Sequence, residues 1–597
     1  MKAIENTGLI LYLAAFGLFA GLFFAGDYRL TDELVREAIR DEKQQTRFIE
    51  NASFMMEQIY EDKFGFISDL NKAFASANTR ISEDFAIKQG EVETIIAAAS
   101  REGPLTFSLS EAQKGLEGDE HTLAFKQKIL SDYGGWLDGR SYSTPDGLRS
   151  NLQETVDNIN RDIVKQRGFN RYTKKRLVLT LTRRATVGLV TEHTTLLFIL
   201  TFVVASMGGL LYNLPKLQTT EPGIQNDGIF FSKMKNRGWL GIATGTFLIL
   251  FYVLLYFYPE YMTNWIILAD PLSNLLNGGE ASEFFLYGFI YTLCILVMGV
   301  RMLIRYRHSR YHIIRTLSVM FFQTAFAFLI PEVLVRLNYP YYDFKNIWPL
   351  DYDFFFSSSL NQLIEGGTLG MFMLVWGIIL IIIAVPLFVF FFGKRWYCSW
   401  VCGCGGLAET LGDPYRQLSD KSLVAWKIER WTVHGVLVLA VVMTAGVLYT
   451  FFTGASTLLG ISTYTISEWY GFAIGAMFAG VVGTGFYPFM GNRVWCRFGC
   501  PLAAYLGIVQ RFRSRFRITT NGGQCISCGN CSTYCEMGID VRWYAQRGQN
   551  IIRSSCVGCG VCASVCPRGV LKLENDDHSN RFDSPILIGN DSVRISE

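Results

Sequence analysis

The chain has 597 residues, of which 50% are hydrophobic and only 18% are charged, and its formal net charge is +3. Soluble globular proteins carry about 25% charged residues, so this composition argues against a soluble protein and indicates membrane segments. A net charge this small argues neither for nor against nucleic-acid binding, and no nucleic-acid partner is predicted.

A helix needs about 20 apolar residues to cross the roughly 30 Å hydrocarbon core of a bilayer. Most of the candidate segments are uncharged at their centres, as the cost of burying an ion in hydrocarbon requires. Eight segments qualify, at roughly 8–25, 195–213, 239–258, 284–303, 313–335, 368–393, 432–453 and 470–490. The sequence therefore predicts a mainly α-helical protein built on a polytopic membrane helix bundle.

The first of these segments is predicted to be an N-terminal membrane anchor, and a cleaved signal peptide is the alternative. Either way, residues 27–190 are exported. They show helical rather than strand-like spacing of apolar residues, which predicts a small helical domain. One helix should be capped by Thr144, with Pro145 in its first turn. Its buried face should consist of Leu152, Val156, Ile159 and Ile163. A docking or spacer role, a ligand-sensing role and a cofactor-binding role all remain open for this domain.

Basic residues are concentrated in the segments that follow the even-numbered spans. The loops 259–283 and 454–469, on the other side, contain no Lys or Arg. By the positive-inside rule, the N-terminus and the C-terminal part 491–597 are cytoplasmic. The sequence therefore predicts a multi-pass protein of the bacterial inner membrane. The basic residues that set this orientation include Arg305, Arg307, Arg310, Arg315, Lys394, Arg395, Arg511, Arg513, Arg515 and Arg517.

Two further features lie near the fifth span. The predicted outer loop 336–367 is rich in aromatic residues, which commonly anchor a protein at the headgroup layer. A docking patch for an external partner is the alternative. Glu332 is an acid at membrane depth and so a functional candidate, for quinone or proton chemistry. Pairing with Arg336 at the interface is the other interpretation.

Cysteines follow the sixth and the eighth spans at matching positions. The stretch "YCSWVCGCGG" holds Cys398, Cys402 and Cys404, and "WCRFGCPLAA" holds Cys496 and Cys500. The shared C-x3-C spacing, the shared membrane side and the flanking tryptophans indicate an internal repeat. Two such pairs at the membrane edge supply four ligands for a further cluster or metal. A redox dithiol or simple capping of helix ends remain alternatives, and Cys404 would be a spare or exchanged ligand.

The clearest motifs are "CISCGNCSTYCEMG" and "CVGCGVCASVCPRG", which both have the spacing C-x2-C-x2-C-x3-C. In this pattern three thiolates hold one cluster and the fourth reaches the other, whereas zinc ribbons use two separated C-x2-C pairs. The motifs therefore predict two [4Fe–4S] clusters. The ligands would be Cys525, Cys528, Cys531 and Cys566 for the first cluster, and Cys556, Cys559, Cys562 and Cys535 for the second. Glu536 stands where a proline usually follows Cys535.

These features divide the chain into six predicted parts. They are an anchor (1–26), an extracytoplasmic helical domain (27–190), a polytopic membrane domain (191–490), a C-x3-C-P segment with a basic linker (491–522), a two-cluster ferredoxin domain (523–575) and a polar tail (576–597). No P-loop and no dinucleotide fingerprint is present, so ATP and NADH sites are not predicted.

Over roughly residues 370–570, the two C-x3-C motifs and the following ferredoxin motifs resemble the NosR/NapH group of membrane polyferredoxins. The resemblance implies an electron-transfer component of an oxidoreductase system. It would pass electrons between the quinone pool or a cytoplasmic donor and an exported reductase or electron carrier of anaerobic respiration. The twin motif of the family carries over to Cys398, Cys402, Cys496 and Cys500.

The sequence departs from this family in two respects. Gly403 follows Cys402 where the family usually has proline. NosR proteins attach a flavin through a threonine in an S-G-A-T-like motif, which residues 27–190 lack, so covalent FMN is not expected. The motifs are also similar to those of CcoG, an oxidase-assembly protein. That similarity implies the alternative function, a redox-sensing regulatory or metalloenzyme-assembly membrane protein.

Overall fold

The computed structural model describes residues 1–99, 106–224, 238–455, 457–458, 460–575, 586–588 and 593–595. This part of the chain is mostly helical, which confirms the predicted fold class. It divides into two compact units. The membrane unit comprises Met1–Phe19, Thr195–Tyr258 and Leu268–Glu597, and the helical unit comprises Ala20–Thr194 and Pro259–Ile267.

The membrane unit contains the eight long apolar helices that the sequence predicts, so the chain is a multi-pass membrane protein. Their bounds are Lys2–Leu22, Thr194–Thr219, Trp239–Phe257, Glu283–Arg305, Arg310–Arg336, Gly367–Phe392, Leu423–Thr453 and Thr463–Gly485. The seventh span begins at Leu423, whereas the sequence predicts a start at 432. The charged residues Lys427, Glu429 and Arg430 lower the hydropathy of its first turns, so these turns do not look like part of a span.

Four of these spans are regular α-helices, and the other four contain π-helical segments. The regular ones are α1 (Lys2–Leu22), α14 (Trp239–Phe257), α17 (Glu283–Arg305) and α25 (Leu423–Thr453). The π segments are Ile199–Val203, Phe322–Leu329, Leu380–Ala384 and Gly471–Val482. Each π segment joins two α-helices of one span. The first joins α11 (Thr194–Phe198) to α12 (Val204–Asn213), and the second joins α18 (Arg310–Phe321) to α19 (Ile330–Arg336). The third joins α21 (Gly367–Ile379) to α22 (Val385–Phe392), and the fourth joins α26 (Thr463–Tyr470) to α27 (Gly483–Gly485). Such segments occur frequently at functional sites.

Short helices connect the spans and carry the cysteine motifs. They are α13 (Lys216–Thr219), α16 (Asp270–Leu276), α20 (Ser357–Glu365), α23 (Arg395–Cys398), α24 (Gly403–Thr410), α28 (Tyr487–Met490), α29 (Val494–Phe498) and α30 (Pro501–Arg513). A 3-10 turn, Asp413–Leu418, follows α24.

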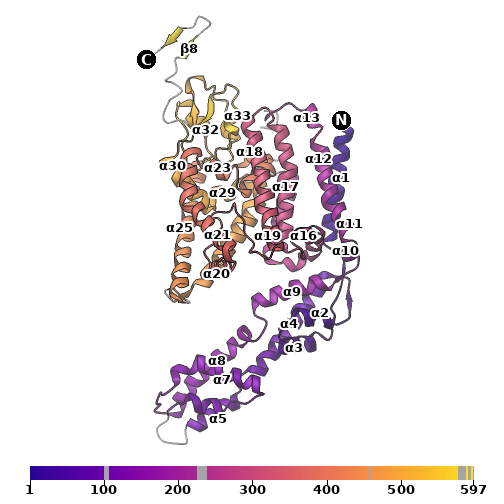
Figure 1. Cartoon of the computed structure of the whole chain (residues 1–597), viewed down its shortest axis with the longest axis vertical. Coiled ribbons are helices and arrows are strands. Elements are labelled where there is room, and N and C mark those ends of the chain that lie inside the picture. Colours follow the sequence, from indigo (N-terminus) through magenta and orange to yellow (C-terminus); the bar gives the residue numbers. More distant parts are fainter. Residues whose placement is uncertain are drawn as a thin grey trace. The chain divides into compact units, whose positions relative to one another are not determined.

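The ferredoxin domain covers one end of the helix bundle (Figure 1). Its strands β6 (Arg517–Thr520) and β7 (Leu571–Glu574) pair antiparallel, with Arg517 opposite Glu574. Its helices are α31 (Asn530–Thr533), α32 (Val541–Gln546) and α33 (Val561–Ser564). Most of the predicted polar tail lies outside the described residues. Within it, β8 (Ile586–Ile588) pairs with β9 (Val593–Ile595).

The helical unit has its own hydrophobic core. Its helices are α2 (Asp32–Ala38), α3 (Glu42–Ala52), α4 (Lys63–Phe85), α5 (Gln89–Ala99), α6 (Leu109–Lys114), α7 (Glu120–Gly134), α8 (Pro145–Gln166), α9 (Arg171–Ala185), α10 (Leu189–Glu192) and α15 (Thr263–Ile267). A small sheet has the strand order β2 (Ile59–Tyr60), β1 (Asp27–Arg29), β3 (Thr186–Val187). The predicted start of α8 is confirmed, because the side chain of Thr144 accepts a hydrogen bond from the amide of Gly147. The four residues of its predicted face are buried.

Lys63, the first residue of α4, is a buried cation in this unit. Its ammonium group donates hydrogen bonds to the carbonyls of Phe23 and Tyr261, at 2.6 and 2.9 Å. Burial lowers the pKa of Lys63 from 10.5 to about 7, because the charged form loses its hydration.

This burial predicts a pH dependence of stability. Above about pH 7 the unfolded chain holds the Lys63 proton more tightly than the folded chain does, so the free energy of unfolding should rise with pH. The slope is at most about 1.4 kcal/mol per pH unit. Urea unfolding of the full chain, followed by pulse proteolysis of the helical unit, should show this rise between about pH 7 and pH 9. The variant K63M should lack this contribution, and an equal rise in both proteins would contradict the assignment.

Candidate iron–sulfur sites

The eight ferredoxin cysteines surround two separate small cavities. One cavity is lined by Cys525, Cys528, Cys531 and Cys566. The other is lined by Cys535, Cys556, Cys559 and Cys562. Each cavity therefore takes three thiols from one motif and the fourth from the other, as the spacing predicts. Gly529 and Gly560, with φ of +81° and +82°, occupy the left-handed region just before α31 and α33, where a side chain would be strained.

The two cavities differ in their surroundings. Cys528 of the first set is exposed, whereas Cys556 and Cys562 of the second set are buried. The second set faces the fifth span: the hydroxyl of Tyr311 donates to the carbonyl of Gly558 at 2.6 Å. The first cavity thus lies nearer to solvent and the second faces the membrane helices.

The twin C-x3-C motifs adopt the same local conformation. Each span is followed by a glycine with positive φ, +69° at Gly393 and +94° at Gly491, and then by a short helix. The amide of Cys402 donates to the carbonyl of Tyr397 at 2.8 Å. At the equivalent position, the amide of Cys500 donates to Trp495 at 2.9 Å. Cys402 and Cys500 then begin α24 and α30, respectively.

These glycines reverse the chain, and the segment that follows each pair of cysteines packs beside the middle of a neighbouring span rather than beside its end. A β-carbon built on Gly403, next to Cys402, would lie 2.6 Å from Oε1 of Gln323, the middle residue of the fifth span. On the other motif, the Tyr505 hydroxyl of α30 donates to the carbonyl of Ile381, near the middle of the sixth span. Non-helical backbone at this depth is stable only when protein surrounds it. Accordingly, Cys398, Cys402, Cys496 and Cys500 are each only 6% or 7% exposed.

The loop between the fifth and sixth spans enters the bundle from the opposite end. The same β-carbon on Gly403 would lie 3.4 Å from the ammonium nitrogen of Lys345, which is 8% exposed. Ile347 packs in the core that contains the twin cysteines, and Trp348 donates to Thr444 of α25 at 3.0 Å. The central part of this loop therefore packs inside the bundle, and the role of its aromatic residues as an interfacial anchor stays a prediction.

Glu332 also has a different partner from the one predicted. It accepts a hydrogen bond from the side-chain amide of Asn277 at 2.8 Å. Arg336 donates instead to the backbone carbonyl of Leu275. Asn277 follows α16 and satisfies the acid because the chain folds back there, which the local sequence does not reveal.

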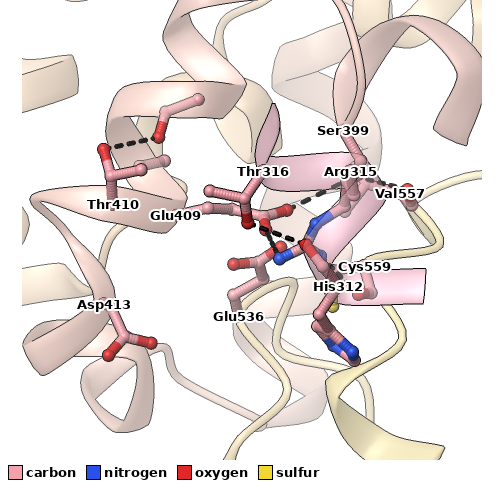
Figure 2. Close-up of polar contacts among 12 residues, drawn as sticks. His312, Arg315, Thr316, Ser399, Glu409, Thr410, Asp413, Glu536, Val557 and Cys559 are labelled. Carbon is pink, nitrogen blue, oxygen red and sulfur yellow. Dashed lines mark hydrogen bonds and ion pairs between the residues drawn. The ribbon is translucent and has the colours of Figure 1, made fainter. Parts of the chain in front are cut away.

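A buried network of ion pairs lies between the twin motif and the second ferredoxin cavity. Figure 2 shows Arg315, Glu409 and Glu536 close together beside Cys559. Arg493 joins the two acids, with its Nη2 2.6 Å from Oε1 of Glu409 and 3.1 Å from Oε1 of Glu536. Its Nη1 also lies 3.6 Å from the sulfur of Cys496. One guanidinium therefore contacts both redox motifs.

Glu536, the departure from the usual proline, is the central acid of this network. It is fully buried, and its Oε2 lies 2.7 Å from Nη1 of Arg416, which is itself 3.9 Å from the sulfur of Cys559. Burial alone would raise the pKa of Glu536, but Arg416, Arg493 and Arg315 lower it to about 2. The carboxylate is therefore ionised and fastens the ferredoxin domain to the helix bundle.

The four twin cysteines share one buried core. Among the residues that the structure describes, no three His, Cys, Asp or Glu side chains converge closely enough to hold one metal ion. Cys404 packs against the core that contains Cys402.

Several residues of this region could not be found from sequence spacing. Arg416, Glu409 and Lys345 come from separate segments, and no local motif connects them. The acid at position 536 was the only visible signal, because it replaced an expected proline in an otherwise regular motif.

Comparisons with protein families agree with this arrangement. A family described as "4Fe-4S binding domain" matches residues 373–422 and again 470–519. Each match contains one C-x3-C pair, so the predicted internal repeat is confirmed. A second family, "4Fe-4S dicluster domain", matches residues 524–570. The chain thus carries [4Fe–4S] cluster domains of the ferredoxin type.

Two curated proteins are similar to part of the chain. One is "Putative electron transport protein YccM" of Escherichia coli, 27% identical over 160 residues, which cover 25% of this chain and 43% of that protein. The other is "Methylamine utilization ferredoxin-type protein MauN" of Methylobacillus flagellatus, 27% identical over 162 residues, which cover 25% of this chain and 50% of that protein. The chain therefore spans about half the length, or less, of these relatives. No solved structure matches the chain. The family matches and the eight apolar helices together describe a membrane protein that carries [4Fe–4S] cluster domains.

Proposed function

We propose that this protein transfers electrons between a quinone or a cytoplasmic donor and a partner reductase of anaerobic respiration, as NosR/NapH-like proteins do. The observation that carries the proposal is the shared packing of the two sets of cysteines. One continuous hydrophobic core contains Cys402 and Cys500 of the twin motif together with Cys531, Cys556 and Cys562 of the ferredoxin domain. Electron transfer requires redox groups to lie close together, and this core brings both motifs within one protein interior.

Three sets of ligands follow from the proposal. The first is Cys525, Cys528, Cys531 and Cys566, the second Cys535, Cys556, Cys559 and Cys562, and the third Cys398, Cys402, Cys496 and Cys500. A [4Fe–4S] cluster accepts and releases a single electron when bound. The exposed Cys528 supports a soluble partner at the first set, and the buried third set supports a partner within or across the membrane.

The other parts of the chain are assigned to one side of the membrane or the other by the basic residues near the spans. The basic segments after the even-numbered spans support a cytoplasmic ferredoxin domain and an exported 27–190 domain, in a bacterial inner membrane. The exported domain would then lie on the side of an extracytoplasmic reductase or electron carrier. The predicted boundaries at 191–490, 491–522 and 523–575 serve as the starting points for constructing domain variants.

The experiment uses the purified full-length protein in lipid vesicles. After reduction with dithionite, addition of a quinone analogue should reoxidise the clusters rapidly, as followed by EPR. A variant that lacks the third set, C496S/C500S, should reoxidise much more slowly with the quinone, while a water-soluble acceptor still oxidises its ferredoxin clusters. A regulatory or assembly protein would show no acceleration by quinone, and that result would refute the electron-transfer proposal for a quinone partner.

A further inference from the structure

A large cavity opens beside the twin motif and has no role in the ligand sets above. Its volume is about 1340 Å³, larger than the roughly 300–1,000 Å³ of common small-molecule pockets. The first turns of α25, the helix α30 and the ferredoxin domain form its walls. Cys496 and Arg497 form part of its inner surface.

The cavity lies at the level of lipid headgroups. Helix α25 has 31 residues and is therefore about 46 Å long, whereas the hydrocarbon core is about 30 Å thick. About ten residues must extend beyond the hydrocarbon, and the charged N-terminal turns are the part that does so. Large apolar side chains beside these turns are exposed: Leu423 is 73%, Trp431 is 75% and Phe512 is 72% exposed. The cavity wall is thus apolar on one side and basic on the other.

Two arginines in the cavity wall contact the same indole ring, and neither of them pairs with a carboxylate in the described part of the chain. The guanidinium carbons of Arg430 and Arg553 lie 5.5 and 5.0 Å from the ring centre of Trp426. Both acids that line the cavity have other partners than these two arginines. Glu429 pairs with Arg497 at 2.7 Å, and Asp540 accepts from the hydroxyl of Ser532 at 2.6 Å.

Both guanidiniums lie near the same indole ring, and arginine binds phosphate through charge-assisted hydrogen bonds that are frequently bidentate. Arg511 lines the same cavity and adds a third positive charge. Basic pockets between membrane helices are typical binding sites for acidic lipid headgroups.

We propose that this cavity binds an anionic phospholipid. The phosphate is held by Arg430 and Arg553, and the acyl chains extend along Leu423, Trp431 and Phe512 into the bilayer. A lipid in this position covers the side of the twin motif that carries Cys496 and keeps water away from it. The proposal concerns lipid binding and holds whether or not the quinone reaction above is found.

The test measures lipid retention by the purified full-length protein. Lipids that remain after detergent washing are extracted and quantified by mass spectrometry. Rebinding is then measured with vesicles of phosphatidylglycerol and, separately, of phosphatidylcholine. Each basic residue near an acidic lipid contributes about a fivefold factor in affinity, so R430Q/R553Q should bind phosphatidylglycerol roughly 25-fold more weakly.

The matched control is R513Q, because Arg513 is on the same helix as Arg511 but does not line the cavity. It should retain lipid like the unmodified protein, and EPR of the ferredoxin clusters should show that all variants are folded. Equal retention by R430Q/R553Q, or equal binding of phosphatidylcholine, would overturn the proposal. Displacement of the lipid by millimolar inorganic phosphate alone would replace it with a free-phosphate site.

Discussion

Replacing Cys496 and Cys500 together with serine should remove about four of about twelve iron atoms per chain, because the third [4Fe–4S] cluster would lose half of its ligands. The pair on the other motif is a poorer target, since Cys404 lies two residues after Cys402, packs against the same core and offers a substitute thiol. No cysteine among the described residues stands in the same relation to Cys500. Iron analysis and EPR spin quantification measure the loss.

Two control variants make this result specific. C404S should keep all iron, because Cys404 is outside the proposed ligand set. C294S should also keep it, since Cys294 lies within α17 and packs against apolar neighbours. The ferredoxin signals should persist in C496S/C500S. A full iron count in that variant would exclude the third cluster and leave a thiol pair or a structural motif.

Replacing Glu536 with glutamine should be the most destabilising single change in the ferredoxin domain. It removes the buried negative charge that Arg416 and Arg493 contact at 2.7 and 3.1 Å. Removing one partner from a buried ion pair typically costs about 3–5 kcal/mol. After this change Arg416 still has Asp413 and Arg493 still has Glu409 as a counter-ion, so the lower end of that range is expected. Thermal unfolding with limited proteolysis of the ferredoxin domain should therefore show its earlier release from the helix bundle.

The change should also raise the reduction potential of the second cluster. Loss of a negative charge next to Cys535 makes an added electron less unfavourable there. E574Q is the matched control, since Glu574 accepts a single hydrogen bond from Thr519 and touches no arginine of the network. Unchanged unfolding and potential in E536Q would show that the network neither holds the domain nor acts on its cluster.

Features that depend on local contacts could be predicted from the sequence, whereas features that depend on contacts between distant segments could not. The eight ferredoxin cysteines follow from spacing, because ligands to one cluster come from short segments of fixed geometry. The eight spans follow from hydropathy, because hydrocarbon admits few alternatives to an apolar helix. Thr144 and Pro145 fixed the start of α8 for the same reason, since a cap is a local contact.

The depth of the twin motif was not predictable in this way. Gly393 and Gly491 look like ordinary helix ends, and only the folded chain shows that the backbone turns back beside Gln323. The approach of Lys345 from the other end of the bundle depends on contacts between segments distant in sequence. Glu536 gave a signal as an unexpected residue, but its three arginine partners are scattered across the membrane unit.

The position of Gly403 beside the middle of the fifth span has a consequence for energy coupling. If the twin motif holds the proposed third cluster, an electron that reaches it would cross part of the transmembrane electric field. A full crossing is worth about 2.3 kcal/mol per charge for each 100 mV, so a half-crossing would be worth about 1.1 kcal/mol. Reduction of the twin-motif site should therefore be electrogenic, and the voltage of an energised membrane would bias the direction of electron flow through it.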